Sequence, residues 1–562
     1  MAEPVALQGV GAAPGVVVGP VLVIDLVEVV VPDLPDPDQA FADAAVAVQQ
    51  DLAALAAQAK GRGRDEAADV LTAQSQMAED PMLTGAVSEK LHAGLSLNAA
   101  IVEASAELSA MLRNLDDPYL AARAADVEEV VDRVARNLAG VPARNVVPGE
   151  PAVIISETLT AAETAQMDPE QVLGFVTETG GPTSHVVIIA RSMGVPAVVG
   201  TGPVTEAVTT GETVAIDGRT GEVIVRPDDH RVDEFTKRSD AHRAAVTAAE
   251  AWRGKSVAYD ERPLTVAANV ANQSDLDRAV AEGADGIGLL RTEFLFLDRP
   301  EPPTEDEQYE FYRRAAAAFD DPVVIRTMDI GGDKPADYLT IPGEENPFLG
   351  VRGARLYRHH AEVFETQVRA ILRAAADGDV WLMAPMVSTI EEIVDLRSWV
   401  NRIAEQTAGG LEPVPFGVMV EVPALALTVD AAAQHVDFLS IGSNDLTQYT
   451  LAADRTNEGL GHLQDAMHPS VVKLCELVAI GGKHAGISTS VCGLSAADPV
   501  AAAVYAAMGI SKLSVSPSMV NQIKAAVAQL DPAGGARAVA DAVTASSAVA
   551  ARSAVEAWRS GP

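Results

Sequence analysis

Eight short apolar runs recur in the second half of the chain, and segments with helical periodicity separate them. The runs span residues 264–270, 286–290, 323–328, 380–386, 416–422, 438–441, 488–491 and 513–515. Eight alternating strands and helices are typical of a closed (β/α)8 barrel. Reactive side chains in such barrels gather at the carboxyl ends of the strands. The residues at those ends are therefore the first candidates for a functional site.

Polar and reactive side chains follow most of these runs. The predicted strand ends carry Asn269, Arg291, Glu293, Arg326, Asp329, Met386, Glu421, Asn444, Asp445 and Cys492. Two carboxylates, Glu421 and Asp445, suit an octahedral Mg²⁺ that completes its shell with substrate oxygens and water. The alternative is a structural ion pair of either carboxylate with Arg291 or Arg326.

Four arginines indicate an anionic substrate. Arg291, Arg326, Arg352 and Arg455 offer planar guanidinium groups that fit phosphate and carboxylate. The thiol of Cys492 follows the seventh run, and we expect it to point into the barrel mouth rather than into a core, as a general acid. We expect the other cysteine, Cys475, to be a packing residue of a helix over 471–480.

A second motif lies outside the barrel, at residues 180–185, with the sequence Gly-Gly-Pro-Thr-Ser-His. It follows a predicted strand and opens a predicted helix, where paired glycines allow a tight turn and free amides favour phosphate. His185 is then a candidate nucleophile that accepts a phosphoryl group. The alternative is an ordinary loop and a histidine of the first helical turn.

Composition restricts the class of protein. A length of 562 residues indicates two to four domains, and a formal net charge of −38 argues against nonspecific nucleic-acid binding. Residues 36–140 carry 18 Asp and Glu against 8 Lys and Arg, which leaves a basic protein partner open. We find no apolar stretch of membrane-spanning length and no signal peptide, so we expect a cytoplasmic protein without membrane insertion.

The pattern along the chain predicts a multidomain α/β protein. Short strands in 1–35 and 141–227 form a small phosphohistidine α/β domain, into which about four helices of 36–140 are inserted. Residues 228–258 form a linker helix, 259–540 the barrel and 541–562 a C-terminal helix or tail.

Long motifs from both halves resemble one family. They are 180–185 with Ala190-Arg191 and 195–200, 116–120 with 123–127, 288–296, 326–334, 345–350 and 441–449. With these motifs the chain resembles the enzyme I family of the bacterial sugar phosphotransferase system, the phosphoenolpyruvate-protein phosphotransferases. Two positions depart from the family pattern: Pro182 stands where many relatives have Lys or Arg, and Leu494 with Ser495 where an acidic residue is common.

The resemblance implies a mechanism and a set of roles. Phosphoenolpyruvate with Mg²⁺ lies in the barrel, His185 attacks its phosphorus, and the phosphoryl group passes to a histidine of the carrier protein HPr on the helical insert. Glu421 and Asp445 hold the metal, Cys492 donates a proton to the enolate, and Thr164 orients His185. The substrate-binding residues that it implies are Arg291, Arg326, Arg352, Asn444, Asp445 and Arg455.

The resemblance also implies a homodimer through the barrel and a swivel of the small domain. A pyruvate phosphate dikinase or phosphoenolpyruvate synthase is the alternative, but such enzymes need a nucleotide-binding domain. The residues before the histidine motif contain no Gly-rich nucleotide loop. A regulator without catalysis is a second alternative, and the presence of His185, Glu421, Asp445 and Cys492 together argues against it.

Overall fold

The computed structural model describes residues 4–560 apart from 25–28, 62–64, 114–117, 142–148, 161–162, 165–166, 169, 181–184, 298, 332–335, 337, 342, 408–409 and 456. The chain divides into two compact units, residues 1–243 and 244–562. Each unit is described by itself.

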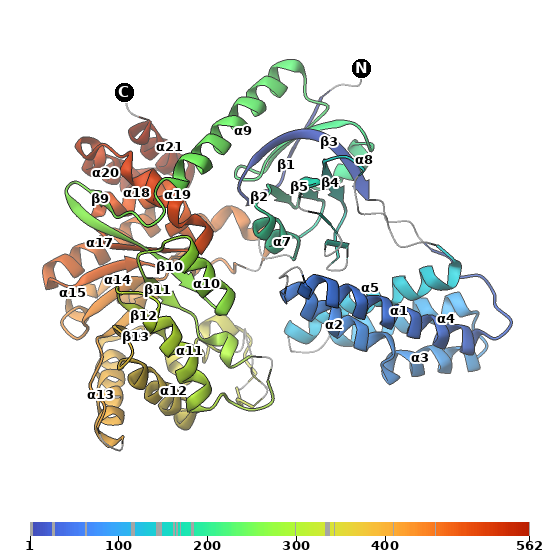
Figure 1. The fold of residues 1–562 in the computed structure, drawn as a ribbon, viewed down its shortest axis with the longest axis horizontal. Coiled ribbons are helices and arrows are strands. Elements are labelled where there is room, and N and C mark those ends of the chain that lie inside the picture. Colours follow the sequence, from blue (N-terminus) through green and yellow to red (C-terminus); the bar gives the residue numbers. More distant parts are fainter. Residues whose placement is uncertain are drawn as a thin grey trace. The chain divides into compact units, whose positions relative to one another are not determined.

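One eight-stranded sheet forms the α/β part of the first unit, in the order β1-β8-β7-β3-β4-β5-β6-β2. Its strands are β1 (Val5–Gln8), β2 (Val10–Ala13), β3 (Val16–Ile24), β4 (Ala152–Ser156), β5 (Val172–Thr177), β6 (Ala197–Val199), β7 (Thr213–Asp217) and β8 (Glu222–Val225). Strands β3 and β4 pair in parallel although more than 120 residues separate them in the sequence. Both can be followed in the sheet of Figure 1. The helical segment is thus inserted between two strands that are neighbours in the sheet.

Strands β1 and β2 were not predicted, because glycines interrupt their apolar pattern. A Cβ on Gly9 would lie 2.7 Å from the carbonyl oxygen of Val199, and one on Gly11 would lie 2.5 Å from that of Arg219. Glycine therefore permits a close approach of backbones here. The sheet carries the helices α7 (His185–Met193) and α8 (Val204–Ala207).

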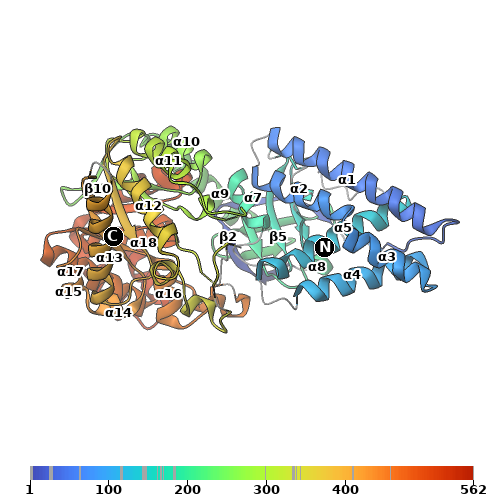
Figure 2. The same ribbon diagram turned by 90° about the horizontal axis from the view of Figure 1, so that it is seen from below.

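Five helices, rather than about four, make up the described part of the helical insert (Figure 2). They are α1 (Pro37–Gly61), α2 (Asp65–Ala78), α3 (Pro81–His92), α4 (Leu97–Arg113) and α5 (Pro118–Ala139). The break between α2 and α3 was missed. There the Asp80 side chain accepts the amide of Met82 at 2.7 Å, and Pro81 occupies the first helical turn. Such a cap starts a new helix without a glycine.

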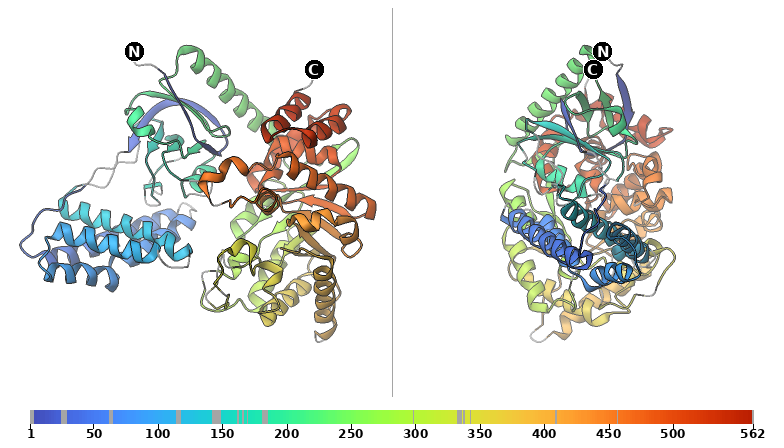
Figure 3. Two further views of the ribbon diagram at one scale, coloured as in Figure 1. Left: turned by 180° about the vertical axis from the view of Figure 1, so that it is seen from behind. Right: turned by 90° about the vertical axis from the view of Figure 1, so that its right-hand side faces the viewer.

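The predicted linker helix is α9 (Asp229–Glu250), a long helix that is seen from behind in Figure 3. Its first turns pack on the sheet, since Phe235 is buried against Ala215 and Ile224. Arg238 forms an ion pair with Asp217 of β7.

The second unit is a closed barrel of eight parallel strands, which confirms the predicted fold class. Its strands are β10 (Arg262–Val270), β11 (Ile287–Leu290), β12 (Val323–Arg326), β13 (Val380–Ala384), β14 (Phe416–Val420), β15 (Phe438–Ile441), β16 (Ser488–Val491) and β17 (Lys512–Val515). Each predicted run holds one of them. A further strand, β9 (Val257–Tyr259), pairs antiparallel with β10.

Helices cover the outside of the barrel. They include α10 (Gln273–Ala281), α11 (Glu305–Ala317), α12 (Ala361–Ala374), α13 (Ile390–Gln406), α14 (Pro423–Leu427), α15 (Val429–Ala432), α16 (Ser443–Leu451), α17 (Pro469–Ala485), α18 (Pro499–Met508) and α19 (Val520–Ala528). Short 3₁₀ turns follow several strands, among them η1 (Glu293–Leu295), η2 (Pro347–Leu349), η3 (Gly353–Arg355) and η5 (Leu494–Ala497). Cys475 is fully buried in α17, as predicted for a packing residue.

The C-terminal segment forms two helices, α20 (Gly535–Thr544) and α21 (Ala548–Arg559), which pack against each other. Arg552 of α21 forms ion pairs with Asp465 at 2.7 Å and with Asp498 at 2.5 Å. The Trp558 ring meets that of Tyr259 edge-on at 6.4 Å. This segment is therefore part of the barrel unit.

Candidate active site

The predicted barrel residues come from the ends of five of the eight strands. Arg291 follows β11, Arg326 ends β12, Glu421 follows β14 and Cys492 follows β16, while Asn444 and Asp445 open α16 after β15. All eight strands run in parallel, so these residues lie at the same end of the barrel.

Arg326 is buried between two carboxylates at this end. Its Nη2 lies 2.9 Å from Glu293 Oε1, and its Nη1 lies 3.1 Å from Asp329 Oδ2. Burial alone lowers the pKa of Arg326, but Glu293 and Asp329 outweigh it and the pKa is raised. The guanidinium therefore keeps its charge although water is nearly excluded.

Arg352 links two parts of the site. It is 1% exposed, and its Nη2 and Nε contact Asp329 at 2.8 and 3.2 Å. Its Nη1 lies 3.1 Å from Asp445 Oδ1, while Asp445 Oδ2 lies 3.2 Å from Arg455 Nη1. Asp445 thus pairs with Arg352 and Arg455 rather than with Arg291 or Arg326, which were the partners considered from the sequence.

Glu421 is the most buried carboxylate of the site. Its Oε1 accepts the amide of Met386 at 2.7 Å, whereas Oε2 has no hydrogen-bond partner in the described part of the chain. Burial, Asp445 and Asp329 raise the pKa of Glu421 to about 8. A Cβ on Gly442 would lie 2.8 Å from Oε2, so only glycine leaves this oxygen its space. An orphaned, buried acceptor of this kind fits a cation ligand.

The Met386 backbone is strained where it meets Glu421. Its φ of 57° lies in the left-handed region, which non-glycine residues rarely adopt. The side chain packs on the backbone of Gly353, where a Cβ would come within 3.0 Å of it. Strain of this kind collects at functional sites, where the surrounding structure holds it.

Cys492 lies deeper than predicted. It is 2% exposed and packs among Leu289, Val324, Met383, Met419 and Phe438 inside the barrel, so the expectation that it avoids a core was wrong. Ser440 Oγ donates to its Sγ at 3.2 Å. Burial raises the pKa of Cys492 to about 11. The sulfur therefore holds its proton at neutral pH, which suits an acid.

Arg291 differs from the other arginines. Among the described residues its guanidinium makes neither an ion pair nor a hydrogen bond, and burial followed by the charge of Arg326 lowers its pKa. A buried guanidinium of this kind fits an anionic ligand. Asn444 is partly engaged, since its Oδ1 accepts the amide of Leu494 at 2.9 Å.

In the first unit, helix α7 begins at His185, as predicted. The preceding Gly180 has a φ of 100°, which confirms the expected turn after β5. Residues 181–184 and the side chain of His185 lie outside the described part. Thr164 is fully buried, and its hydroxyl donates to the carbonyl of Thr160 at 3.0 Å.

Three family models match the chain in succession. Residues 8–123 match the N-terminal domain of PEP-utilising enzymes, 148–221 their mobile domain and 247–532 their PEP-binding domain. A phosphoenolpyruvate-protein phosphotransferase of Haloferax volcanii is 41% identical, over 88% of this chain and 87% of its own length. The enzyme of the same name from Streptomyces coelicolor is 39% identical over 99% of both chains. This chain belongs to the phosphoenolpyruvate-protein phosphotransferase family.

Membership of the phosphoenolpyruvate-protein phosphotransferase family confirms the predicted family and enzyme class, rather than the dikinase alternative. A solution structure of Enzyme I (nEIt) is 32% identical over 42% of this chain and 99% of its own, with a TM-score of 0.38. The finer domain boundaries and the role of each site residue stay predictions. In the described part of the chain, every helix is too short or too polar to span a membrane.

Sequence reasoning assigned no role to several residues of this phosphotransferase site. Asp329 and Glu293 were noticed at strand ends, but their contacts with Arg326 and Arg352 were not foreseen. Tyr449 and Phe348 were quoted only within motifs, yet the Tyr449 hydroxyl donates to the Phe348 carbonyl. The positions lie 101 residues apart, so no local pattern signals the contact.

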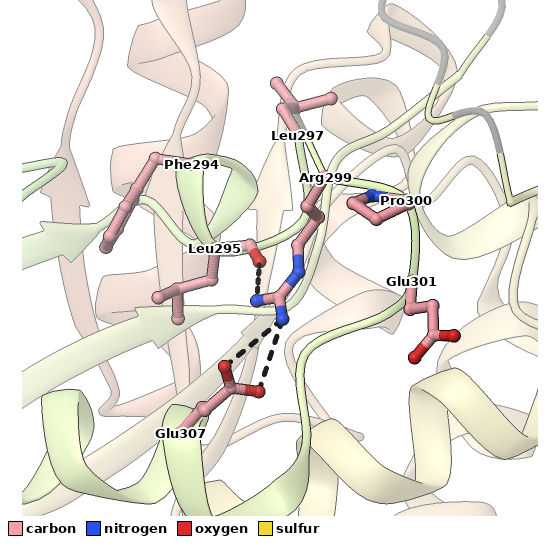
Figure 4. Close-up of a pocket in the computed structure, with 7 residues that line it drawn as sticks. All are labelled: Phe294, Leu295, Leu297, Arg299, Pro300, Glu301 and Glu307. Carbon is pink, nitrogen blue, oxygen red and sulfur yellow. Dashed lines mark hydrogen bonds and ion pairs between the residues drawn. The ribbon is translucent and has the colours of Figure 1, made fainter.

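A pocket of about 460 Å³ lies beside η1 (Figure 4). Its lining consists of Phe294, Leu295, Leu297, Arg299, Pro300, Glu301 and Glu307. Arg299 spans the pocket from the Leu295 carbonyl at 3.2 Å to the Glu307 carboxylate. None of the predicted site residues lines this pocket. The pocket therefore shares no lining residue with the site described above.

Proposed function

We propose that this chain transfers the phosphoryl group of phosphoenolpyruvate to His185 and from there to a histidine of the carrier protein HPr. In this role it starts sugar uptake by the phosphotransferase system. One observation carries the proposal: at one end of the barrel lie a buried carboxylate oxygen and an arginine that have no partner among the described residues, together with a protonated thiol.

The substrate is expected to bind through its phosphate and carboxylate. Arg291 has no described anionic partner, so phosphate would compensate for its burial. Arg326, Arg352 and Arg455 are already oriented by carboxylates, which lowers the entropy lost when they bind a ligand. Asn444 directly precedes Asp445 in the first turn of α16, and we assign it to the same ligand.

The reaction needs one nucleophile and one acid. An unprotonated ring nitrogen of His185 attacks phosphorus while the bond from phosphorus to the enol oxygen breaks. The electron pair stays with the enolate, whose terminal carbon takes the proton of Cys492, and pyruvate leaves. The raised pKa of Cys492 keeps this proton available at neutral pH. Thr164 is assigned the orientation of the His185 ring.

Two carboxylates of this chain fit a divalent cation. Glu421 Oε2 has no partner among the described residues, and each oxygen of Asp445 accepts only one described arginine contact, which leaves a lone pair on each. We assign Glu421 and Asp445 as the Mg²⁺ ligands, with substrate oxygens completing the shell. When bound, the metal neutralises charge that develops on the phosphoryl and enolate oxygens.

The partners follow from charge and from family membership. The acidic insert offers a surface for a basic carrier protein such as HPr, and a homodimer through the barrel is proposed by analogy. We also propose a cytoplasmic location.

Labelling with phosphoenolpyruvate tests the proposal. Incubation with Mg²⁺ and phosphoenolpyruvate labelled at phosphorus is expected to give an acid-labile, alkali-stable protein phosphate that HPr removes. His185→Ala should abolish labelling, whereas His230→Ala on α9 should label like the unaltered chain. Equal labelling of His185→Ala would refute the assigned nucleophile, and an unlabelled wild-type chain would refute the activity.

A further inference from the structure

The hydroxyl of Tyr449 joins three segments of the barrel end. Tyr449 lies on α16, the helix that also carries Asn444 and Asp445. Its hydroxyl donates to the Phe348 carbonyl, accepts from Arg352 Nη1 at 3.5 Å and lies 3.8 Å from Met386 Sδ. Burial raises the pKa of Tyr449 to about 12, so the group remains a donor at physiological pH.

The ring of Phe348 faces two of the substrate-binding arginines. The Arg455 guanidinium carbon lies 5.3 Å from the ring centroid, and that of Arg352 lies 5.8 Å away. Both distances are within the range of cation–π attraction. Carboxylates anchor Arg352 on two sides, whereas among the described residues only Asp445 holds Arg455 by an ion pair. The ring therefore matters most for Arg455.

Hydrogen bonds, rather than apolar burial, fix the turn that carries Phe348. The next residue, Leu349, is 64% exposed. Glu344 accepts the amide of Val351 at 2.9 Å, and Arg355 donates to the carbonyls of Leu349 and Gly350 at 3.0 and 3.1 Å. The contact from Tyr449 ties this turn to α16, the helix that carries Asp445.

We propose that Tyr449 is a positioning residue for substrate binding. Its hydroxyl holds the turn 347–349 so that the Phe348 ring fixes the guanidinium groups of Arg455 and Arg352 toward the phosphate of the substrate. The proposal rests on the function proposed above. Because Tyr449 acts on groups that bind the substrate before any bond changes, its loss is expected to raise KM and leave kcat nearly unchanged.

Tyr449→Phe removes only the hydroxyl. Loss of one such hydrogen bond corresponds to an increase of about 3- to 10-fold in KM and in the Kd for phosphoenolpyruvate. The matched control is Tyr338→Phe, because the Tyr338 hydroxyl also donates to a backbone carbonyl, that of Phe296, at 2.6 Å. The control should lose similar stability but keep its KM. Equal KM values for Tyr449→Phe and the wild-type chain would overturn the proposal, as would an equal rise in the control.

A double-mutant cycle separates the ring from general loosening of the loop. Phe348→Leu keeps the carbonyl but removes the aromatic face, so it should raise KM, and Phe348→Tyr should restore it. In the Phe348→Leu background the additional effect of Tyr449→Phe should shrink toward onefold. Full additivity would show that Tyr449 does not act through the ring.

The wild-type chain distinguishes this inference from the proposed function. If the wild-type chain fails to bind or accept phosphate from phosphoenolpyruvate, the proposed function fails. If it binds and reacts, and Tyr449→Phe matches it in KM and Kd, only the role of Tyr449 fails.

Discussion

The two ends of the barrel both bury charged side chains, but they satisfy them differently. At the carboxyl end of the strands, Glu421 Oε2 and Arg326 Nε lack partners in the described part of the chain. At the amino end, the fully buried Lys524 Nζ donates to the Gly283 carbonyl at 2.9 Å and to Asp285 Oδ1 at 2.5 Å. Asp285 Oδ2 in turn accepts the amide of Val266 at 2.8 Å.

This difference separates groups kept for a ligand from groups kept for the fold. A buried polar atom without a partner costs free energy unless something binds it. In a buried ion pair, the attraction between the two charges offsets part of the free energy that they lose on leaving water. Substitutions at the carboxyl end should therefore change the chemistry, and those at the amino end should change stability.

The largest expected effect is that of Glu421→Gln, which keeps the shape but removes the anionic ligand. Phosphoryl transfer to the protein should fall by about 10³-fold or more, measured by single-turnover labelling.

The same substitution tests the pH dependence of stability. The pKa of Glu421 in the folded chain, about 8, exceeds the ordinary 4.5, so its contribution to stability is present below pH 4.5 and lost as pH rises through 8. Without metal, the variant should be at least as stable as the wild-type chain at pH 8, and a lower melting temperature would contradict this.

Lys524→Met should show the opposite behaviour. Removing one partner of this buried pair leaves Asp285 uncompensated, so the free energy of unfolding should fall by about 3–5 kcal/mol. Labelling below the melting temperature should not change. Chemical denaturation measures the loss of stability, and single-turnover labelling measures the activity. A loss of labelling in the folded variant would contradict the proposed difference between the two ends of the barrel.

Cys492→Ser should slow turnover by about 10²-fold, because a hydroxyl is a weaker acid than the thiol. Pyruvate release is the measurement. Since the pKa of Cys492 is about 11, the wild-type rate should show no decline from loss of this proton between pH 6 and 9. A decline assigned to Cys492 in that range, absent from the variant, would show that the thiol is more acidic than its burial implies.

The smallest effect is expected at the C-terminal helix. Burial alone raises the pKa of Asp465, but Arg552 outweighs it and the pKa is lowered. Asp465→Asn should therefore cost about 1–2 kcal/mol of unfolding free energy at neutral pH. Because the pKa of Asp465 is lowered in the folded state, its contribution to stability is present above the ordinary carboxyl pKa and is lost as pH falls through the pKa of the folded state. The difference in unfolding free energy between the wild-type chain and Asp465→Asn should therefore shrink in acid. Asp541→Asn, in an exposed pair with Arg537, is the control and should cost little.

Much of the architecture was predictable because the signals are local. Each apolar run that forms a barrel strand is a few residues long. Because the strands are parallel, the polar residues that follow the runs all lie at one end of the barrel and identify it as the end of the candidate site. Local signals failed for β1 and β2, whose glycines break the apolar pattern, and for the break at Asp80. The depth of Cys492 was also misjudged, since side-chain burial inside a barrel depends on all of the facing strands.

By itself, the sequence determined the barrel, the helical insert between β3 and β4 and the positions of the reactive side chains, because strand alternation and turn residues act over short distances. Only the tertiary structure decided which charges meet. The contacts of Arg352 with Asp445 and of Tyr449 with Phe348 depend on the folded barrel, whereas Asp329 pairs with Arg326 and Arg352, and Asp445 with Arg455, over shorter stretches of chain. The folded barrel brings Arg352 and Asp445, 93 positions apart, and Phe348 and Tyr449, 101 positions apart, into contact, and the chain order of their motifs does not specify the pairing.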